Sequence, residues 1–394
     1  MQTNIVQRHL NILDYALSSL WRHRLKNGGI ALIFSLVIFL LASFQLLTHS
    51  LQQTAEKVLL FSPDITLQRL SAGRQIALPA SRIKTLSSLF GIKKIVPRIW
   101  GYHFDEKNGA NYTVLGLPAL TANRQNLFPL LQGRMPHGGK RGEVVLSTSV
   151  RDSLGLGERN SFTFFRPDLS QISFTVVGVF SKSTDILTGD VILMDLEDAR
   201  DLFLMEKGFA TDLAIDVTNP AEIDTIAATI SNLMPDTRVL TRSQIRKTYQ
   251  AVFGWRSGFG SICLLTALAS FAILAWDKAS GLSQEEKREI GILKFLGFQT
   301  SDILALRFWE SGVIAVVAFL FGLTLAYIHV AYFEGALFKP MLVGWSVLRP
   351  GLNLDPAVTF ADLLLVFSYS VLPYLAATII PAWRSAIIRA DTVI

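Results

Sequence analysis

Four long apolar segments dominate the pattern of hydrophobic and polar positions along this chain of 394 residues. They are residues 30–47, 257–276, 311–328 and 363–383, and none of them contains Asp, Glu, Lys or Arg. Each is close to the roughly 20 residues that a helix needs to cross about 30 Å of hydrocarbon, and a core helix of a soluble protein is rarely apolar on all sides for so long. The pattern predicts four transmembrane helices.

The stretch between the first two apolar segments, roughly residues 48–254, has the pattern of a folded hydrophilic domain. Short runs rich in β-branched and aromatic residues, bounded by Gly, Pro or Asn, predict strands at residues 64–68, 111–115, 143–146, 161–165 and 172–180. Helices are predicted at residues 81–90, 195–207 and 220–233. These elements alternate too irregularly for a doubly wound sheet. We therefore expect a large extracytoplasmic α+β domain, of one lobe or two, inserted between transmembrane helices 1 and 2.

Positive charges near the ends of the apolar segments set the expected orientation. They stand before the first segment, between the second and third, and after the fourth (Arg22, Arg24, Lys26, Lys287, Arg288, Lys294, Arg384 and Arg389). Placing all three groups in the cytoplasm requires an even number of spans, which four provides. Another basic group stands on the side expected to be outside (Arg238, Arg242, Arg246, Lys247 and Arg256), but long domains cross the membrane largely regardless of charge.

This topology divides the chain into successive predicted parts. Residues 1–28 form a cytoplasmic amphipathic interface helix, and residues 29–48, 256–280, 303–330 and 361–383 form the membrane spans. Residues 49–255 form the extracytoplasmic domain, 281–302 a cytoplasmic helical region, 331–360 an outer connector and 384–394 a cytoplasmic tail. We expect a multi-pass membrane protein with both termini in the cytoplasm.

The N-terminal stretch, residues 10–26, carries apolar residues at helical spacing (Leu10, Leu13, Leu17, Leu20, Trp21 and Leu25). With Arg22, Arg24 and Lys26 beside Trp21, it predicts a helix that lies in the membrane interface; a simple basic anchor is the alternative. The first apolar segment is longer than the core of a secretory signal and lacks a small-residue cleavage site, so we expect an uncleaved anchor.

Composition narrows the classes of function. The chain is 50% hydrophobic and 17% charged, which is too apolar and too charge-poor for an ordinary soluble domain of this length. Its single cysteine, Cys263, excludes an internal disulfide, and its histidines show no ligand spacing, so we expect no metal site. The net charge of +6 comes without a basic-aromatic motif, which favours a membrane surface over nucleic acid.

The segment from Glu285 to Gly297 is a charged, helix-forming stretch between the second and third apolar segments. At helical spacing it presents a charged rim and an apolar ridge, formed by Glu285, Arg288 and Glu289 and by Ile290, Leu293 and Leu296. Gly297 suits the left-handed residue that ends a helix, and Ser301-Asp302 suits the start of the next one. Such a short helix between two spans is typical of a docking surface that carries a push along its axis.

The same segment resembles a known family, the permease subunits of FtsX/MacB/Lol-type ABC transporters. The resemblance is carried by Arg288-Glu289-Ile290-Gly291-Ile292-Leu293-Lys294-Phe295-Leu296-Gly297 and by the following Glu310. Residues 16–26 are similar to the family's N-terminal interface helix, and residues 381–386 are similar to its closing motif. In the insert, Gly133-Arg134 followed by Gly142-Glu143, together with residues 154–157 and 174–179, resembles the outer domain of the MacB group.

The resemblance implies a division of labour between this chain and a separate ABC ATPase. The implied coupling residues are Glu285, Arg288, Glu289, Ile290, Gly291, Leu293, Lys294, Leu296 and Gly297. The chain has no G-x-x-x-x-G-K-[ST] loop, so we expect no enzyme activity and no cofactor in it, with ATP and Mg²⁺ bound by the partner ATPase. The resemblance also implies a dimer with a second permease copy or homologue; a periplasmic adaptor or substrate carrier is left open, and no nucleic-acid partner is expected.

Two functions fit this resemblance. The first is export or extraction of an amphiphilic substrate, a lipid, lipoprotein or peptide, at the outer face of the inner membrane, driven by movement of the extracytoplasmic domain. The alternative is an FtsX-like transmitter that activates a periplasmic cell-wall hydrolase, although the outer domains of such proteins tend to be smaller. A third hypothesis, an ATP-independent membrane sensor, leaves the motif at residues 288–297 unexplained.

The sequence also makes predictions for several single positions in or near the apolar segments. Glu310 is either an ion or substrate site or the partner of a structural ion pair with Arg307 or Arg288. Gly312 and Gly322 predict close packing between helices, and Asp362 is expected to lie at the membrane interface. Residues 331–359 are broken by prolines and predict an outer connector with Trp345 at headgroup level.

Overall fold

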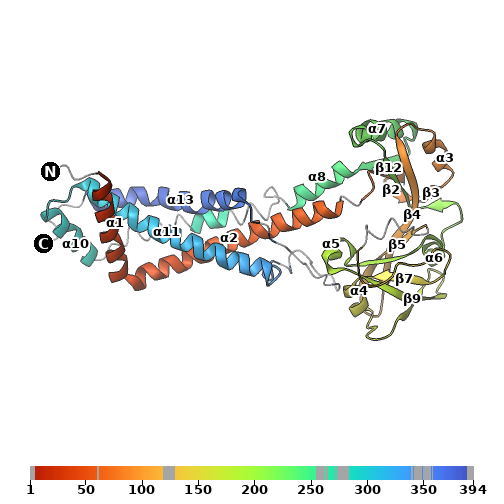
Figure 1. Ribbon diagram of the computed structural model, residues 1–394, viewed down its shortest axis with the longest axis horizontal. Coiled ribbons are helices and arrows are strands. Elements are labelled where there is room, and N and C mark those ends of the chain that lie inside the picture. The colour runs from red at the N-terminus through yellow and green to blue at the C-terminus, as the bar shows by residue number, and fades with distance from the viewer. Residues whose placement is uncertain are drawn as a thin grey trace. The chain divides into compact units, whose positions relative to one another are not determined.

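The computed structural model describes residues 5–59, 62–118, 129–253, 284–338 and 359–387, together with residues 262, 265–270, 273, 340, 348, 356 and 358. The chain divides into two compact units, shown with their elements in Figure 1. The helical unit comprises Met1–Ser50, Phe253–Phe338 and Asp355–Ile394. The sheet unit comprises Leu51–Val252 and Lys339–Leu354.

Long helices make up the helical unit. They are α1 (Ile5–Arg22), α2 (Arg24–Leu59), α10 (Gln284–Phe295), α11 (Thr300–Ala331) and α13 (Phe360–Ala386). Within the described residues, three helical stretches are long and apolar enough to cross a membrane: Arg24–Thr54, Thr300–Ala331 and Phe360–Ile380. They cover the first, third and fourth apolar segments. The predicted second span, residues 256–280, lies mostly outside the described residues, so the count of four stays a prediction.

Helix α11 packs closely against α2 at Gly322. A Cβ atom there would stand 2.7 Å from the backbone oxygen of Ser35 and 2.9 Å from Cβ of Ile38, which confirms the predicted close approach of two helices. At Gly312, by contrast, a Cβ atom would have nothing within 4 Å. Among the described residues Gly312 makes no such contact, and its packing role stays a prediction.

A buried carboxylate links α13 to α2. Asp362 is 5% exposed, and it accepts hydrogen bonds from the backbone N–H of Thr359 and from Nε2 of Gln45 at 3.1 and 2.9 Å. Nδ1 of His49 lies 2.8 Å from the same carboxylate. Two residues of α2 thus provide the partners that a buried carboxylate needs, while the expected position of Asp362 at the membrane interface stays a prediction.

The sheet unit is an α+β domain, as predicted. Its strands are β1 (Ile65–Ser71), β2 (Arg74–Ile76), β3 (Leu78–Pro79), β4 (Ile92–Asp105), β5 (Ala110–Leu117), β6 (Leu130–Gly133), β7 (Glu143–Leu146), β8 (Ser161–Phe165), β9 (Gln171–Phe180), β10 (Val191–Asp195), β11 (Phe209–Ala210), β12 (Asp212–Val217) and β13 (Thr237–Thr241). Its helices are α3 (Arg82–Ser87), α4 (Thr148–Ser153), η2 (Lys182–Thr184), α5 (Asp185–Thr188), α6 (Leu196–Leu202), η3 (Pro220–Glu222), α7 (Ile223–Leu233) and α8 (Arg242–Phe253).

One long strand joins the two halves of the main sheet, whose order in the described residues is β13-β1-β12-β4-β5-β10-β7-β9-β6. Strand β4 pairs with β12 from Ile92 to Arg98 and with β5 from Ile99 to Asp105, both antiparallel. Separate hydrophobic cores lie on the two halves. One gathers Leu67, Leu213, Ile215 and Ile230, and the other gathers Tyr112, Val114, Phe174 and Ile192. The open choice between one lobe and two is settled as separate cores on the two halves of one continuous sheet.

Central strands of the second half are apolar on both faces. In β10, Ile192 and Met194 pack into the core with Tyr112, whereas Val191 and Leu193 pack into another cluster on the opposite face. Because side chains of a strand alternate between faces, a strand buried on both sides is apolar at every position. Leu348, from the connector that follows α11, is 4% exposed and joins the core around Tyr112; most of the predicted connector, Trp345 included, lies outside the described residues.

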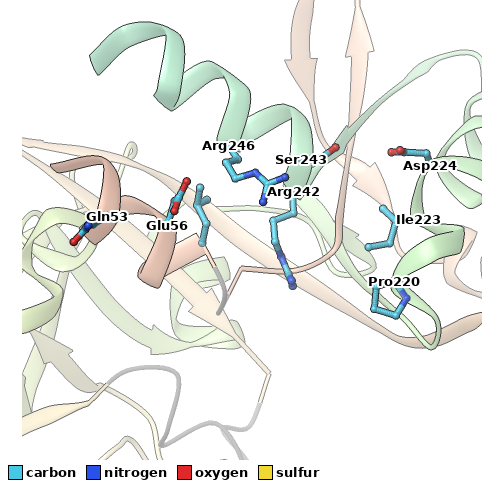
Figure 2. A pocket seen from close by; sticks show the side chains of 9 residues that line it. Gln53, Glu56, Pro220, Ile223, Asp224, Arg242, Ser243 and Arg246 are labelled. Atoms are coloured by element: carbon cyan, nitrogen blue, oxygen red, sulfur yellow. The ribbon is translucent and has the colours of Figure 1, made fainter. Parts of the chain in front are cut away.

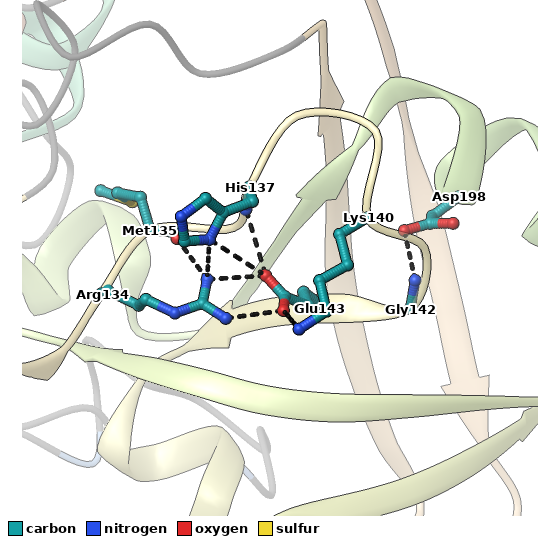
Figure 3. A network of polar contacts seen from close by, with 7 residues as sticks. All are labelled: Arg134, Met135, His137, Lys140, Gly142, Glu143 and Asp198. Atoms are coloured by element: carbon teal, nitrogen blue, oxygen red, sulfur yellow. Dashed lines mark hydrogen bonds and ion pairs between the residues drawn. The ribbon is translucent and has the colours of Figure 1, made fainter.

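The loop between β6 and β7 contains a network of ion pairs and hydrogen bonds (Figure 3). Glu143 is 4% exposed, and its carboxylate accepts two hydrogen bonds from the guanidinium of Arg134, at 2.6 and 2.7 Å. Nζ of Lys140 lies 2.9 Å away, and the backbone N–H of His137 donates at 3.1 Å. These contacts, the Arg134 hydrogen bonds first, hold the pKa of Glu143 well below its usual range.

We expect Glu143→Gln to destabilise the sheet unit, because it replaces a charged acceptor and leaves the cations of the loop without their partner. The expected loss is about 1–3 kcal/mol, which thermal unfolding of the purified chain at pH 7 would register as a lower melting temperature. A depressed pKa stabilises the fold above the unfolded-state pKa of about 4.3. The difference from the wild type should therefore be constant between pH 5 and 8 and shrink below about pH 4.

The matched control is Glu158→Gln, which changes an exposed carboxylate of the same unit. It should leave the melting temperature unchanged. Equal losses for the two variants would contradict the structural role of the Glu143 pair.

Candidate coupling site

Helix α10 is the predicted coupling helix, and its C-terminus has the predicted geometry. Gly297 follows the helix with a φ of 93°, the left-handed conformation in which glycine has no Cβ penalty. The next helix starts two residues earlier than expected. Gln299 is the N-cap of α11, and Asp302 closes a capping box with it instead of forming the cap with Ser301.

Two of the three predicted ridge residues face inward. Ile290 is buried against Ile303 of α11 and Ala386 of α13. Leu293 is buried in a second cluster with Ile12 and Ala16 of α1 and Leu306 of α11. Gly291, between them, is buried as well. The interpretation of Ile290 and Leu293 as parts of an open docking ridge is therefore corrected: these residues hold α10 against the rest of the helical unit.

Exposed apolar side chains cluster instead at the C-terminal end of α10. Phe295 and Leu296 are 72% and 73% exposed, and Ile292 and Phe298 are exposed beside them. We call Ile292, Phe295, Leu296 and Phe298 the apolar tip. Contiguous exposed apolar residues on an otherwise polar helix mark an interaction surface. Of the predicted ridge, Leu296 alone belongs to the tip.

Glu289 is a hub between α10 and α1. Its carboxylate accepts a hydrogen bond from the Tyr15 hydroxyl at 2.6 Å and another from the Arg22 guanidinium. Nε2 of His23 lies 3.9 Å away, and the guanidinium of Arg22 stacks over the Tyr15 ring at 5.4 Å. Burial, followed by the bond to Glu289, raises the pKa of Tyr15, so the hydroxyl remains a donor. Charge-assisted bonds of this kind are about twice as strong as neutral ones.

Two further ion pairs surround the same helices. Arg8 of α1 donates to Asp302 at 2.8 Å. Glu310 of α11, which is 3% exposed, accepts a hydrogen bond from Ser19 of α1 at 2.8 Å and one from Arg307 at 2.7 Å. Of the two expectations for Glu310, the structural ion pair with Arg307 is the one that the geometry shows.

Helix α1 therefore has distinct faces. Ile12, Ala16 and Ser19 are buried against α10 and α11, whereas Leu10, Leu17 and Trp21 are exposed. Arg22 and Arg24 are exposed close to Trp21, with the guanidinium of Arg24 5.9 Å from the indole ring. Lys26 is exposed in the first turn of α2. An exposed apolar stripe beside exposed cations is the pattern of a helix in a membrane interface.

The remaining predicted coupling residues, Arg288, Lys294 and Glu285, differ in their exposure. Arg288 is exposed and Lys294 is half-buried. Glu285 lies in the first turn of α10, and its side chain lies outside the described residues. A cavity of about 470 Å³ runs between α1 and α10 and is lined by Arg22, His23, Arg288, Ile292 and Leu296, among others. Arg288 and Glu289 of the charged rim and Ile292 and Leu296 of the apolar tip thus line one groove, whose other wall is α1.

Sequence reasoning missed α1 as part of this site. Arg8 and Asp302 are separated by 294 positions, and Tyr15 and Glu289 by 274, so no local pattern connects them. Tyr15 could have indicated this contact, because it is the polar aromatic residue on a face of α1 otherwise made of small and apolar residues.

Comparison with known proteins shows the family to which the chain belongs. The MacB-like periplasmic core domain matches residues 28–233, and the FtsX-like permease C-terminal domain matches residues 257–389. The chain belongs to the MacB/FtsX-like family of ABC transporter permeases. Members of this family are membrane subunits whose ATPase is separate.

A curated relative and two solved structures are similar to parts of the chain. An uncharacterized ABC transporter permease of Methanocaldococcus jannaschii is 28% identical over 165 residues, which are 39% of this chain and 39% of that protein. The periplasmic region of MacB from Actinobacillus actinomycetemcomitans is 14% identical over 47% of this chain and 91% of its own, with a TM-score of 0.34. The extracellular domain of the ABC-type transporter YknZ from Gram-positive bacteria is 12% identical over 45% and 99%, with a TM-score of 0.33.

Proposed function

We propose that the chain couples a partner ATPase, docked on the apolar tip of α10, to movement of its sheet unit. The observation that carries this proposal is the contrast along α10. Its middle is held against the rest of the helical unit, with Leu293 packed against α1 and α11 and Glu289 bonded to α1, while its C-terminal end exposes Phe295 and Leu296. A helix that is held in its middle and is apolar at its exposed end is suited to receive a push from a docked partner and pass it on.

The proposed path of the push runs from α10 through α1 to α2. Leu293 packs against Ile12 and Ala16, and Glu289 bonds to Tyr15 and Arg22, so α1 has to follow α10. Arg22 ends α1, and α2 starts at Arg24, so little chain is left between them to absorb a displacement. Helix α2 is continuous from Arg24 to Leu59 and contributes its last residues to the sheet unit.

As substrate we propose an amphiphile, a lipid, lipoprotein or peptide, handled at the outer face of a bacterial inner membrane. The large sheet unit supports this function over the FtsX-like transmitter, which stays an alternative. The working assembly would be a dimer of this chain, or of this chain with a homologue, carrying two ATPases that bind ATP and Mg²⁺. Both termini, α10 and residues 384–394 would lie in the cytoplasm.

Co-purification tests the coupling proposal. The full chain is expressed with a candidate ABC ATPase, and complex formation and ATP hydrolysis are measured in nanodiscs. We expect a stable complex that hydrolyses ATP, and no hydrolysis by the chain alone. Hydrolysis by the chain alone would refute the division of labour, and failure to bind any such ATPase would refute the docking role.

A further inference from the structure

A cavity in the sheet unit has no part in the proposed coupling. It has a volume of about 550 Å³ and lies between the last turns of α2, the start of η3 and α7, and the first turns of α8 (Figure 2). Its lining residues are Gln53, Glu56, Leu59, Pro220, Ile223, Asp224, Arg242, Ser243 and Arg246. Volumes of roughly 300–1,000 Å³ are typical of sites for small ligands.

The cationic wall of this cavity is α8. Arg242 and Arg246 stand on adjacent turns of this helix and both line the cavity (Figure 2). Arg242 is fixed in place: its guanidinium lies 2.9 Å from the Asp64 carboxylate and donates to the backbone oxygen of Ser62. Asp64 is in turn held by the backbone N–H of Val217 at 2.8 Å. The wall is therefore arranged before any ligand arrives.

Guanidinium groups are the donors that a ligand can reach on this wall. Nε of Arg242 is buried, but its side chain as a whole is 31% exposed. Arg246 is exposed on the next turn. These two guanidiniums come from the basic group at residues 238–256 that the expected topology left without a role.

Acidic and apolar groups complete the lining. Glu56 of α2 and Asp224 of α7 bring two exposed carboxylates to the cavity, so the lining carries both signs of charge. Leu59, Pro220 and Ile223 add apolar surface. A simple anion in the cavity would be repelled by the carboxylates, and a simple cation would be repelled by the guanidiniums. A ligand with both charges, joined by a short alkyl link, avoids both costs.

We infer that this cavity binds a zwitterionic head group that carries a phosphate and a primary ammonium. The phosphate accepts hydrogen bonds from Arg242 and Arg246, for which guanidinium is well suited. The ammonium donates to Glu56 and Asp224, and the alkyl link packs against Leu59 and Ile223. Phosphoethanolamine has this chemistry, either as a free molecule or as the head group of a membrane lipid.

The test uses the full chain without any ATPase, so its outcome is independent of the coupling proposal. Calorimetry measures binding of phosphoethanolamine, inorganic phosphate and ethanolamine to the purified chain. We expect phosphoethanolamine to bind at least tenfold more tightly than either half, because each half satisfies one charge and opposes the other. Equal binding of phosphate and phosphoethanolamine, or no binding of phosphoethanolamine or of its lipid, would overturn the inference.

Native mass spectrometry of the chain released from nanodiscs then separates the two sources of the head group. Retention of phosphatidylethanolamine over phosphatidylglycerol assigns the site to a membrane lipid. Binding of soluble phosphoethanolamine with neither lipid retained assigns it to the free molecule. Both outcomes support the zwitterionic site, whereas retention of both lipids to the same extent contradicts it.

Variants locate the site. Arg246→Glu and Asp224→Asn change exposed side chains of the lining, so the fold should survive, and each should weaken binding at least tenfold. The matched control is Lys247→Glu, which changes an exposed residue next to Arg246 that is not among the lining residues; it should stay within twofold of the wild type. Equal losses for Arg246→Glu and Lys247→Glu would show a diffuse charge effect and refute the site.

Discussion

Replacing Leu296 with Asp should abolish association with the ATPase while leaving the helical unit folded. Leu296 is 73% exposed, so its removal leaves no cavity inside the chain. In the complex, the change loses about 1.5–3 kcal/mol of apolar burial and places an unpaired carboxylate in a desolvated contact. The combined effect should weaken binding by about 100-fold or more. Titration of the purified ATPase against the nanodisc-embedded variant measures it.

A matched control is Leu131→Asp, which changes a leucine of β6 that is 58% exposed in the sheet unit. It should bind the ATPase as the wild type does. If Leu296→Asp binds normally, the apolar tip is not the docking surface, and another exposed face of the helical unit must carry that role.

The apolar tip also shows which features of α10 can be predicted from the sequence and which cannot. The existence of α10, its end at Gly297 and the place of Leu296 follow from local pattern, because spacing and glycine conformation are local properties. Which apolar face of α10 is covered depends on α1, α11 and α13, and the contacts with α1 join residues 274 positions apart. An apolar stripe predicts burial, but it does not say whether the partner lies in the same chain or in another one. Ile290 and Leu293 were misassigned for that reason.

Strand β4 illustrates the same limit in the sheet unit. Its first half contains Pro97 and Arg98, which argue against a central strand, and no predicted element covers it. In the structure Arg98 pairs with the buried Asp212 of β12 at 2.7 Å, and the indole of Trp100 donates to the same carboxylate at 2.8 Å. The charges are neutralised across the sheet by a residue more than a hundred positions away, which no local pattern reveals. By contrast, β7 and β9 carry their own apolar and β-branched signal and were predicted.

Replacing Glu289 with Ala should separate docking from transmission. Glu289 is turned toward α1, where Tyr15 and Arg22 bond to it, and the apolar tip is left intact. ATPase binding should therefore stay within about threefold of the wild type, which is less than 1 kcal/mol. Without the hub, α1 loses its charge-assisted bonds to α10 and should no longer follow it. Hydrogen exchange of the complex, with and without an ATP analogue, measures the consequence.

In the wild type, the nucleotide should change exchange in α10, in α1 and in the sheet unit. In Glu289→Ala the change in hydrogen exchange should persist in α10 and disappear from α1 and from the sheet unit. The charge swap Arg22→Glu with Glu289→Arg restores an ion pair between the same two positions, and it should recover part of the response, with a coupling energy of about 0.5–3 kcal/mol between the two sites. A variant that loses ATPase binding together with the response would make Glu289 a docking residue. A variant that keeps the full response would show that the push reaches α2 by packing of Leu293 alone.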